Sequence, residues 1–352
     1  KKALDPNNIL NPGKMGFDDS IKDIYDYFAF RSLLEKPGEI QTFGNALDNE
    51  IMACIMCGFC RAGCPTYGET SLESINARGR VILAYHLLTG RLEPSKELAE
   101  RFYKCTTCLN CNAVCPAGVK VADIIQAARA RLVKAGYLPP VDQTLMASIE
   151  EHGNPFGEAT EKRTEIFPTE FKPKDKAPTL LYFGCVASYQ DINIVPSALK
   201  IMKEAHVDFT SLGSKEHCCG YISYLVGDEK EFENSINKNI GFFKDRGFKE
   251  IVTTCAGCYR TFKDLYPKYR PLDGVQVFHI VEYLEKLIQD RRLNLKDGAK
   301  KTKVAYHDPC DIGRHMNVYD PPRNVIRALP SVELVEFPQN RNLARCCGGG
   351  GG

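Results

Sequence analysis

The spacing of apolar residues divides the chain into a helical part and a part in which strands and helices alternate. In segments 71–90 and 121–135, apolar residues recur three and four positions apart, and a glycine closes each run. This periodicity is typical of amphipathic helices, and a glycine after the last apolar residue is a common stop signal. We predict helices in both segments and a third over 94–103, within an all-α domain over residues 51–140.

From residue 179 onward, short continuous apolar runs alternate with stretches of helical periodicity. Runs of this length that are bounded by turn residues are typical of buried strands. The predicted strands are 179–185, 207–212, 249–255, 303–310 and 332–337. The predicted helices are 194–205, 231–246 and 321–329. Strands that alternate with helices indicate α/β units with parallel sheets.

Three segments have the composition of turns and connections. Residues 1–16 contain Asp-Pro and Asn-Pro turn signals. Residues 17–50 are mixed and charged, and we interpret them as a connector with a short helix over 21–34. Residues 141–178 are rich in Pro, Glu and Lys, which indicates an extended linker with one helix over 143–152.

Two identical cysteine motifs lie inside the predicted helical domain. Each reads C-x2-C-x2-C-x3-C-P, the first from Cys54 to Pro65 and the second from Cys105 to Pro116. This spacing directs three thiolates to one [4Fe–4S] cluster and the fourth to a second cluster. Zinc is the alternative metal, because thiolates bind it as well, but it needs only four ligands, in two C-x-x-C pairs.

Crossed ligation assigns the last cysteine of each motif to the cluster of the other motif. The first [4Fe–4S] cluster is predicted to bind Cys54, Cys57, Cys60 and Cys115. The second is predicted to bind Cys105, Cys108, Cys111 and Cys64. Arg78 and Arg80 lie between the motifs, where they either stabilise the negative charge of a cluster or remain solvated helix charges.

The other eight cysteines lie at the ends of predicted strands or in the loops that follow. Open α/β sheets bind their ligands at this edge. Cys185 and Cys218 are separated by 32 residues, and Cys310 and Cys346 by 35, so we interpret the region as one duplicated unit.

The two copies differ in length. The first copy, residues 179–298, continues to a C-A-G-C motif. The second copy, residues 299–352, stops five residues after Cys347, without a C-x-x-C. We expect the missing motif downstream and therefore interpret the chain as part of a longer polypeptide; a complete chain with a glycine tail is the alternative.

Spacing and local sequence together resemble a known cysteine-rich domain. The sequences Y-F-G-C, H-C-C-G and H-D-P-C are similar to those of the CCG domain, which occurs in the B and D subunits of heterodisulfide reductase and in glycolate oxidase iron–sulfur subunits. The resemblance implies that a non-cubane [4Fe–4S] cluster is bound by Cys185, Cys218, Cys219, Cys255 and Cys258. It implies that part of another site is formed by Cys310, Cys346 and Cys347. Zinc, an ordinary cube or no metal are the alternatives at this second set.

Two further segments resemble parts of redox enzymes. The helical domain, with forty residues between Cys64 and Cys105, is similar to the α-helical ferredoxin of succinate dehydrogenase and fumarate reductase. Residues 4–14, L-D-P-N-N-I-L-N-P-G-K, resemble the carboxyl-terminal signature of FAD-linked oxidases of the vanillyl-alcohol-oxidase type. This second resemblance implies that residues 1–16 end a preceding flavoprotein domain and that FAD is bound there or on a partner. A chance linker is the alternative.

Charge and hydropathy narrow the functional classes. Lys and Arg total 46 against 44 Asp and Glu, a net charge of +2 that gives no electrostatic basis for binding nucleic acid. No apolar run is long enough to span a bilayer, and no secretion signal opens the chain. Because the cysteine spacings fit metal sites, we predict a reducing, cytoplasmic location, with membrane contact only through a partner.

These features predict an iron–sulfur electron-transfer oxidoreductase. The main hypothesis is the iron–sulfur portion of a flavin-dependent D-lactate or glycolate dehydrogenase. The alternative is a protein similar to the D subunit of heterodisulfide reductase, which cleaves a disulfide of the CoM-S-S-CoB type, and a third possibility is an electron carrier without its own catalysis. Expected partners are a flavoprotein and an acceptor such as a cytochrome b, a quinone-linked protein, a ferredoxin or an electron-transfer flavoprotein.

His217 and His307 are candidate proton donors for thiol chemistry, or structural hydrogen-bonding groups.

Overall fold

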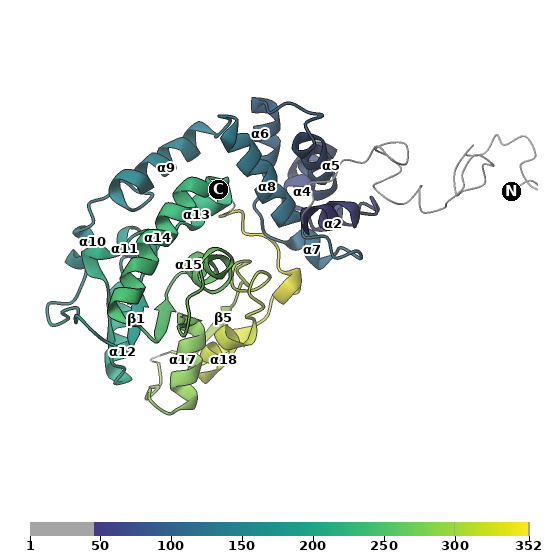
Figure 1. Ribbon diagram of the computed structural model, residues 1–352. Coiled ribbons are helices and arrows are strands. Elements are labelled where there is room, and N and C mark those ends of the chain that lie inside the picture. The colour runs from purple at the N-terminus through teal and green to yellow at the C-terminus, as the bar shows by residue number, and fades with distance from the viewer. Residues whose placement is uncertain (1–45, 299, 351–352) are drawn as a thin grey trace, which may run out of the picture.

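The computed structural model describes residues 46–350 except Ala299 (Figure 1). The flavoprotein-like segment 1–16 and the helix expected over 21–34 lie outside the described residues. None of the described helices combines the length and apolarity needed to cross a bilayer.

The amino-terminal part of the described chain is entirely helical, as predicted. Its elements are α2 (Ala46–Met52), α3 (Cys60–Gly63), α4 (Pro65–Thr70), η3 (Glu73–Ile75), α5 (Ala77–Leu88), α6 (Lys96–Tyr103), α7 (Asn110–Ala113) and α8 (Val121–Lys134). The predicted helix over 71–90 begins only at Ala77, because the Asn76 side chain caps α5 by accepting a hydrogen bond from the Gly79 N–H. Tyr85, Phe102 and Ile124 are completely buried where α5, α6 and α8 pack together.

The segment interpreted as a linker contains more structure than its composition suggests. It forms α9 (Pro140–His152) and α10 (Lys162–Glu165). Figure 1 shows α9 leading from the helical domain to the neighbourhood of α10 and α11. Met146 and Ile149 of α9 pack with Cys185 and Cys218, so this segment belongs to the core of the next domain.

The first α/β unit is built on a parallel sheet with strand order β2-β1-β3-β4. Its strands are β1 (Thr179–Tyr182), β2 (Phe209–Thr210), β3 (Glu250–Thr253) and β4 (Gln276–His279). Its helices are α11 (Gly184–Tyr189), α12 (Ile194–Glu204), η4 (Gly213–Lys215), α13 (Tyr221–Val226), α14 (Glu229–Arg246), α15 (Ala256–Arg260), the π-helical turn η5 (Thr261–Leu265), α16 (Tyr266–Tyr269) and α17 (Ile280–Gln289). The predicted parallel α/β fold is confirmed.

Both faces of this sheet are covered. Leu180 and Tyr182 of β1 point into a core shared with α14 and η5, whereas Leu181 points into a core shared with α12 and α17. All four residues of β1 are buried, which is typical of a central parallel strand. The buried sheet holds the loops after β1 and β3, which carry cysteines, against one another.

The second α/β unit is smaller and more exposed. It contains β5 (Thr302–Ala305), α18 (Asp320–Ala328), β6 (Val332–Val335) and η6 (Arg341–Leu343), with β5 and β6 parallel. Three of the four residues of β5 are exposed. Helix α18 packs against α17 of the first unit, and the two lie side by side in Figure 1.

Candidate iron–sulfur and thiol sites

Two small cavities in the helical domain collect the cysteines of the two repeated motifs. One cavity, of about 30 Å³, is lined by Cys111 and by the four cysteines predicted for the first cluster, Cys54, Cys57, Cys60 and Cys115. The other, also about 30 Å³, is lined by the four predicted for the second cluster, Cys64, Cys105, Cys108 and Cys111. Each cavity therefore contains three cysteines of one motif and the last of the other, and the first cavity also contains Cys111. The ligand assignment itself stays a prediction.

Arginines border both cavities. Arg80 borders the second cavity, is 1% exposed, and donates from Nε to the Arg101 carbonyl at 2.7 Å. Its Nη2 is buried and has no hydrogen-bond partner among the residues that the structure describes, so a cationic donor is available where a negatively charged cluster would sit. Arg78 borders the first cavity and donates to the Met56 carbonyl at 2.8 Å. The alternative of a solvated side chain does not hold for Arg80.

The five cysteines of the first α/β unit form one continuous thiol cluster, called set 1 here. Hydrogen bonds link Cys185 to Cys218, Cys218 to Cys219, Cys219 to Cys258, and Cys258 to Cys255. All but Cys255 are buried. The thiols come from four places along the chain, and the ends of β1 and β3 bring them together.

Hydrogen bonds within set 1 favour the thiolate form at Cys219 or Cys255. Donation from Cys218 and Cys258 lowers the pKa of Cys219 to about 6. Cys258 carries a single S–H, which can donate to Cys219 or to Cys255 but not fully to both; donation to Cys255 lowers the pKa of Cys255 to about 7. Thiolates are the metal-binding form of cysteine, so the cluster has the chemistry that a thiolate-ligated metal group requires.

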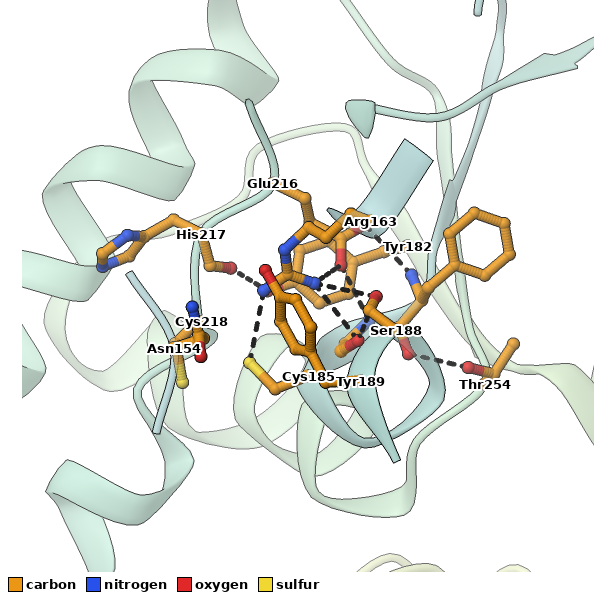
Figure 2. A network of polar contacts seen from close by, with 12 residues as sticks. Asn154, Arg163, Tyr182, Cys185, Ser188, Tyr189, Glu216, His217, Cys218 and Thr254 are labelled. Carbon is orange, nitrogen blue, oxygen red and sulfur yellow. Dashed lines mark hydrogen bonds and ion pairs between the residues drawn. The ribbon is translucent and has the colours of Figure 1, made fainter. Parts of the chain in front are cut away.

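A buried ion pair stands directly beside set 1 (Figure 2). Arg163 and Glu216, each with a 2% exposed side chain, lie 3.1 Å apart from Nη1 to Oε1. Arg163 Nη2 is 3.4 Å from the Cys185 sulfur, and Nη1 also donates to the Ser188 hydroxyl at 2.9 Å. Burial opposes the charge on Arg163, but the Glu216 carboxylate and the nearby Cys185 raise its pKa overall. The guanidinium of Arg163 therefore stays positively charged next to the sulfur of Cys185.

Glu216 in turn fixes the loop that carries Cys185. Its carboxylate accepts hydrogen bonds from the N–H groups of Phe183 at 3.1 Å and Gly184 at 2.8 Å. Gly184 has φ +78°, and a Cβ there would lie 2.9 Å from the Cys258 sulfur. Only glycine allows both this conformation and this close approach of backbone to thiol. The cradle, the donor set and the adjacent cation all fit a negatively charged iron–sulfur group.

The three cysteines of the second unit, called set 2 here, lie in a different environment. Cys310 and Cys346 are partly buried, whereas Cys347 is exposed. A hydrogen bond from Cys108 lowers the pKa of Cys346 to about 5, which places set 2 in contact with a predicted cluster ligand of the helical domain. The Cys346 sulfur also lies 3.4 Å from the Thr106 hydroxyl.

The two candidate histidines point away from this chemistry or into solvent. His217 is buried, which lowers its pKa to about 4. Its ring points away from Cys185 in Figure 2 and lies against Gly153, where a Cβ would be 2.7 Å from Nδ1. His307 is exposed. Within the described residues, neither ring makes a hydrogen bond to a cysteine sulfur, and the proposed proton-donor role stays a prediction.

Sequence patterns missed several residues that surround the thiols. Arg163 lies in the segment interpreted as a linker, and Glu216 sits 53 positions later along the chain. Arg260, Asp311 and His315 also lie near the cysteines, as described below. In the sequence, only their position could have indicated a role, because Arg260, Asp311 and His315 each follow a cysteine by one to five residues.

No group of three or more His, Cys, Asp or Glu in residues 46–350, Ala299 aside, is arranged to hold a single metal ion. This finding concerns mononuclear sites. The thiols described above surround cavities or form an extended chain.

Comparisons with known proteins agree with this arrangement. Residues 50–119 match the family model of a 4Fe-4S dicluster domain. Residues 179–263 and 304–352 match the CCG cysteine-rich domain. The dicluster match covers both repeated motifs, and the two CCG segments carry set 1 and set 2. No solved structure matches the chain significantly.

Relatives are found among redox proteins. The D subunit of the dihydromethanophenazine:CoB–CoM heterodisulfide reductase of Methanosarcina barkeri is 31% identical over 323 residues, covering 86% of this chain and 79% of that protein. The probable iron-sulfur-binding oxidoreductase FadF of Bacillus subtilis is 30% identical, covering 96% of this chain and 54% of that protein. The EtfAB:quinone oxidoreductase of Syntrophomonas wolfei is 26% identical, covering 89% and 50%. The chain thus belongs to the family of iron–sulfur oxidoreductases that includes the D subunit of heterodisulfide reductase.

Proposed function

We propose that this chain transfers electrons through two [4Fe–4S] clusters to set 1 and that a disulfide substrate is reduced there. The observation that carries the proposal is the continuous cluster of five thiols, four of them buried, with the Arg163 guanidinium 3.4 Å from the Cys185 sulfur. The extent of the similarity to the D subunit of heterodisulfide reductase supports it. Of the two enzymatic hypotheses from the sequence, this one was the alternative, and it now has the stronger support.

The residues of the chain have defined tasks in this proposal. Clusters bound at the eight cysteines of the helical domain supply one-electron transfer. Arg163 offsets the negative charge of the thiolates, Glu216 holds the Cys185 loop, and burial of the surrounding side chains excludes water. Reduction of a disulfide R–S–S–R′ takes two electrons and two protons and yields RSH and R′SH. The electrons would come from a reduced carrier protein of the classes predicted above.

The test uses the natural full-length protein under anaerobic conditions. After reduction with dithionite and removal of the excess, CoM-S-S-CoB is added and cluster absorbance is followed. We expect reoxidation with release of two thiols per disulfide. A Cys219→Ser variant, which keeps the helical domain intact, should lose thiol release. Persistently reduced clusters in the wild-type protein would overturn the proposal.

A second candidate is the oxidation of D-lactate or glycolate by a flavin, with this chain as the electron acceptor. The resemblance of residues 4–14 to FAD-linked oxidases favours it. In this case D-lactate should bleach flavin and cluster absorbance together, and CoM-S-S-CoB should have no effect. We also propose a flavoprotein partner and a cytoplasmic location, to be tested by co-purification and cell fractionation.

A further inference from the structure

A buried arginine lies between three of the four cysteine sites described above: set 1, set 2 and the cavity predicted to hold the second cluster. Arg260 belongs to α15, two residues after Cys258 of set 1, and its side chain is 5% exposed. Its Nη1 donates to the Tyr221 hydroxyl at 2.8 Å and lies 3.5 Å from the Asp311 carboxylate. Tyr221 follows Cys219 of set 1 by two residues, and Asp311 directly follows Cys310 of set 2.

The carboxylate of Asp311 lies between the two sets. Tyr221 donates a hydrogen bond to it. Because Asp311 adjoins Cys310, this hydrogen bond joins the loop of set 2 to the helix that follows Cys219 of set 1. Arg260 therefore offsets the negative charge of a carboxylate that stands between the two sets.

The same guanidinium reaches the helical domain through a histidine. Arg260 Nη1 lies 3.4 Å from His315 Nε2, which is 2.8 Å from the Thr107 carbonyl. A carbonyl can only accept, so Nε2 carries the proton and donates it to Thr107, and Arg260 packs against the ring without a hydrogen bond. The neighbouring Arg314 donates to the Cys108 carbonyl at 2.5 Å. Arg314 and His315 thus hold the loop between Cys105 and Cys108, two predicted ligands of the second cluster, through hydrogen bonds to its carbonyl groups.

We propose that Arg260 is a positioning residue that fixes set 1, set 2 and the Cys105–Cys108 loop relative to one another, so that electron transfer between them depends on its planar guanidinium. Tyr221 and Tyr224 enclose the group, with ring centroids 5.5 and 5.9 Å from its central carbon. The planar guanidinium of arginine can contact a hydroxyl, a carboxylate and a ring edge at the same time, whereas the ammonium of lysine is a compact point charge without this geometry. The electron-transfer part of this inference rests on the cluster ligation proposed above; the positioning part does not.

The experiment compares three variants of the full-length protein. Arg260→Gln removes both the positive charge and the planar guanidinium, whereas Arg260→Lys keeps the charge alone. Lys263→Gln removes a neighbouring, partly exposed cation and is the matched control. Hydrogen exchange of the amides in 105–108 and 310–316 reports positioning. Rapid freezing after dithionite reduction, followed by electron paramagnetic resonance, reports electron transfer to set 1.

For Arg260→Gln we expect exchange in both segments to rise at least about 10-fold and electron transfer to slow by at least about 10-fold, because a misplacement of about 1 Å can cost about 100-fold in rate. Iron content and the cube spectra should stay unchanged. Arg260→Lys should recover part of both losses, and Lys263→Gln should match the wild-type protein. Unchanged exchange and rate in Arg260→Gln, or equal effects of Lys263→Gln, would overturn the proposal.

Two further variants keep the inference testable if Arg260→Gln does not fold. His315→Gln retains an N–H donor for the Thr107 carbonyl, whereas His315→Leu does not. Exchange in 105–108 should rise only in His315→Leu, and equal exchange in the two variants would contradict the proposed hold on this loop. If the wild-type protein shows no set 1 signal, the cluster proposal fails, and the exchange data alone decide the positioning role.

Discussion

The two α/β units share a cysteine pattern but place their thiols in opposite surroundings. In the first unit, β1 is buried between β2 and β3, and four of the five thiols of set 1 are buried. In the second unit, β5 pairs with β6, most of its residues are exposed, and Cys347 is exposed as well. The cysteine spacing therefore specifies where a thiol lies along the fold, whereas the packing of neighbouring elements determines how far that thiol is shielded from solvent.

Buried arginines serve the two units differently. Arg163 reaches the Cys185 sulfur of set 1 as well as Glu216. Arg323, completely buried in the second unit, binds the carboxylates of Asp308 at 2.6 Å and Glu336 at 2.7 Å. The first arginine acts on the thiols, whereas the second holds strand and loop together. The comparison predicts that only the first unit tunes a redox group through its ion pair.

The largest expected difference concerns the thiols themselves. Cys219→Ser should abolish the set 1 spectral signal and lower disulfide reduction by at least about 100-fold, because loss of a predicted ligand should cost more than loss of a group that only supports a ligand, which costs about 10–100-fold. Cys347→Ser, at an exposed thiol, should leave that signal intact. Electron paramagnetic resonance and thiol release measure both variants. Equal losses would erase the distinction between the sets.

Next in size is the loss of each buried arginine. Arg163→Met leaves Glu216 buried and unpaired, so the free energy of unfolding should fall by about 3–5 kcal/mol. The double variant Arg163→Met/Glu216→Gln should recover part of this loss in denaturant titrations followed by circular dichroism. Arg323→Met should also destabilise the protein, but only Arg163→Met should shift the reduction potential of set 1. A similar shift in Arg323→Met would break the comparison.

A smaller effect depends on pH and belongs to the first unit. Burial lowers the pKa of His279, the capping residue of α17, to about 4, so it is neutral when folded and takes up a proton near its ordinary pKa of about 6.5 when unfolded. The contribution of His279 to stability should therefore fall as pH decreases through this window, by about 1 kcal/mol between pH 7 and pH 5.5. His279→Asn keeps a capping side chain without the titration; because the buried His217 and His315 also have lowered pKa values, its unfolding free energy should still decrease, but by about 1 kcal/mol less than that of the wild-type protein. Parallel pH profiles would refute the assignment.

The smallest effect is expected on the exposed sheet of the second unit. Lys303 and Glu333 face each other across β5 and β6 at 3.3 Å, with side chains 73% and 64% exposed. Lys303→Ala should cost less than about 1 kcal/mol, because exposed ion pairs contribute little. Thermal unfolding with and without 0.5 M salt (about 3–5 Å screening length) should give nearly the same midpoint for both proteins. A larger cost would mean that this sheet is more rigid than its exposure implies.

Local patterns predicted much of the fold. The helices around the repeated motifs and the strands β1 and β3 follow the apolar periodicity, because each buries one stripe or one short run, and β5 and β6 also form at their predicted positions although they are largely exposed. The crossed cysteine sets line the two cavities, as the motif spacing predicts. Strand β4 (Gln276–His279) and helix α17 (Ile280–Gln289), which follows it directly, were not predicted.

The surroundings of the thiols could not be predicted in the same way. Arg163 lies in a segment rich in Pro and charged residues, and its burial depends on Glu216, Ser188 and Cys185, all distant in sequence. The Arg260 contacts with Asp311 and His315 likewise join elements 51 and 55 positions apart. Such contacts arise only once the sheet has brought the loops together, so no local periodicity encodes them.

The position of α9 and α10 has a practical consequence for dividing this polypeptide into separate proteins. A boundary drawn where composition changes, near residue 178, would leave Arg163 on the ferredoxin fragment and an uncompensated Glu216 on the other. A cut before Pro140 would keep the cation with its thiols, although the Arg129 contact with the Leu225 carbonyl would then have to form between two chains. Gene fission, or an engineered two-component version, is therefore constrained to the short stretch between α8 and α9.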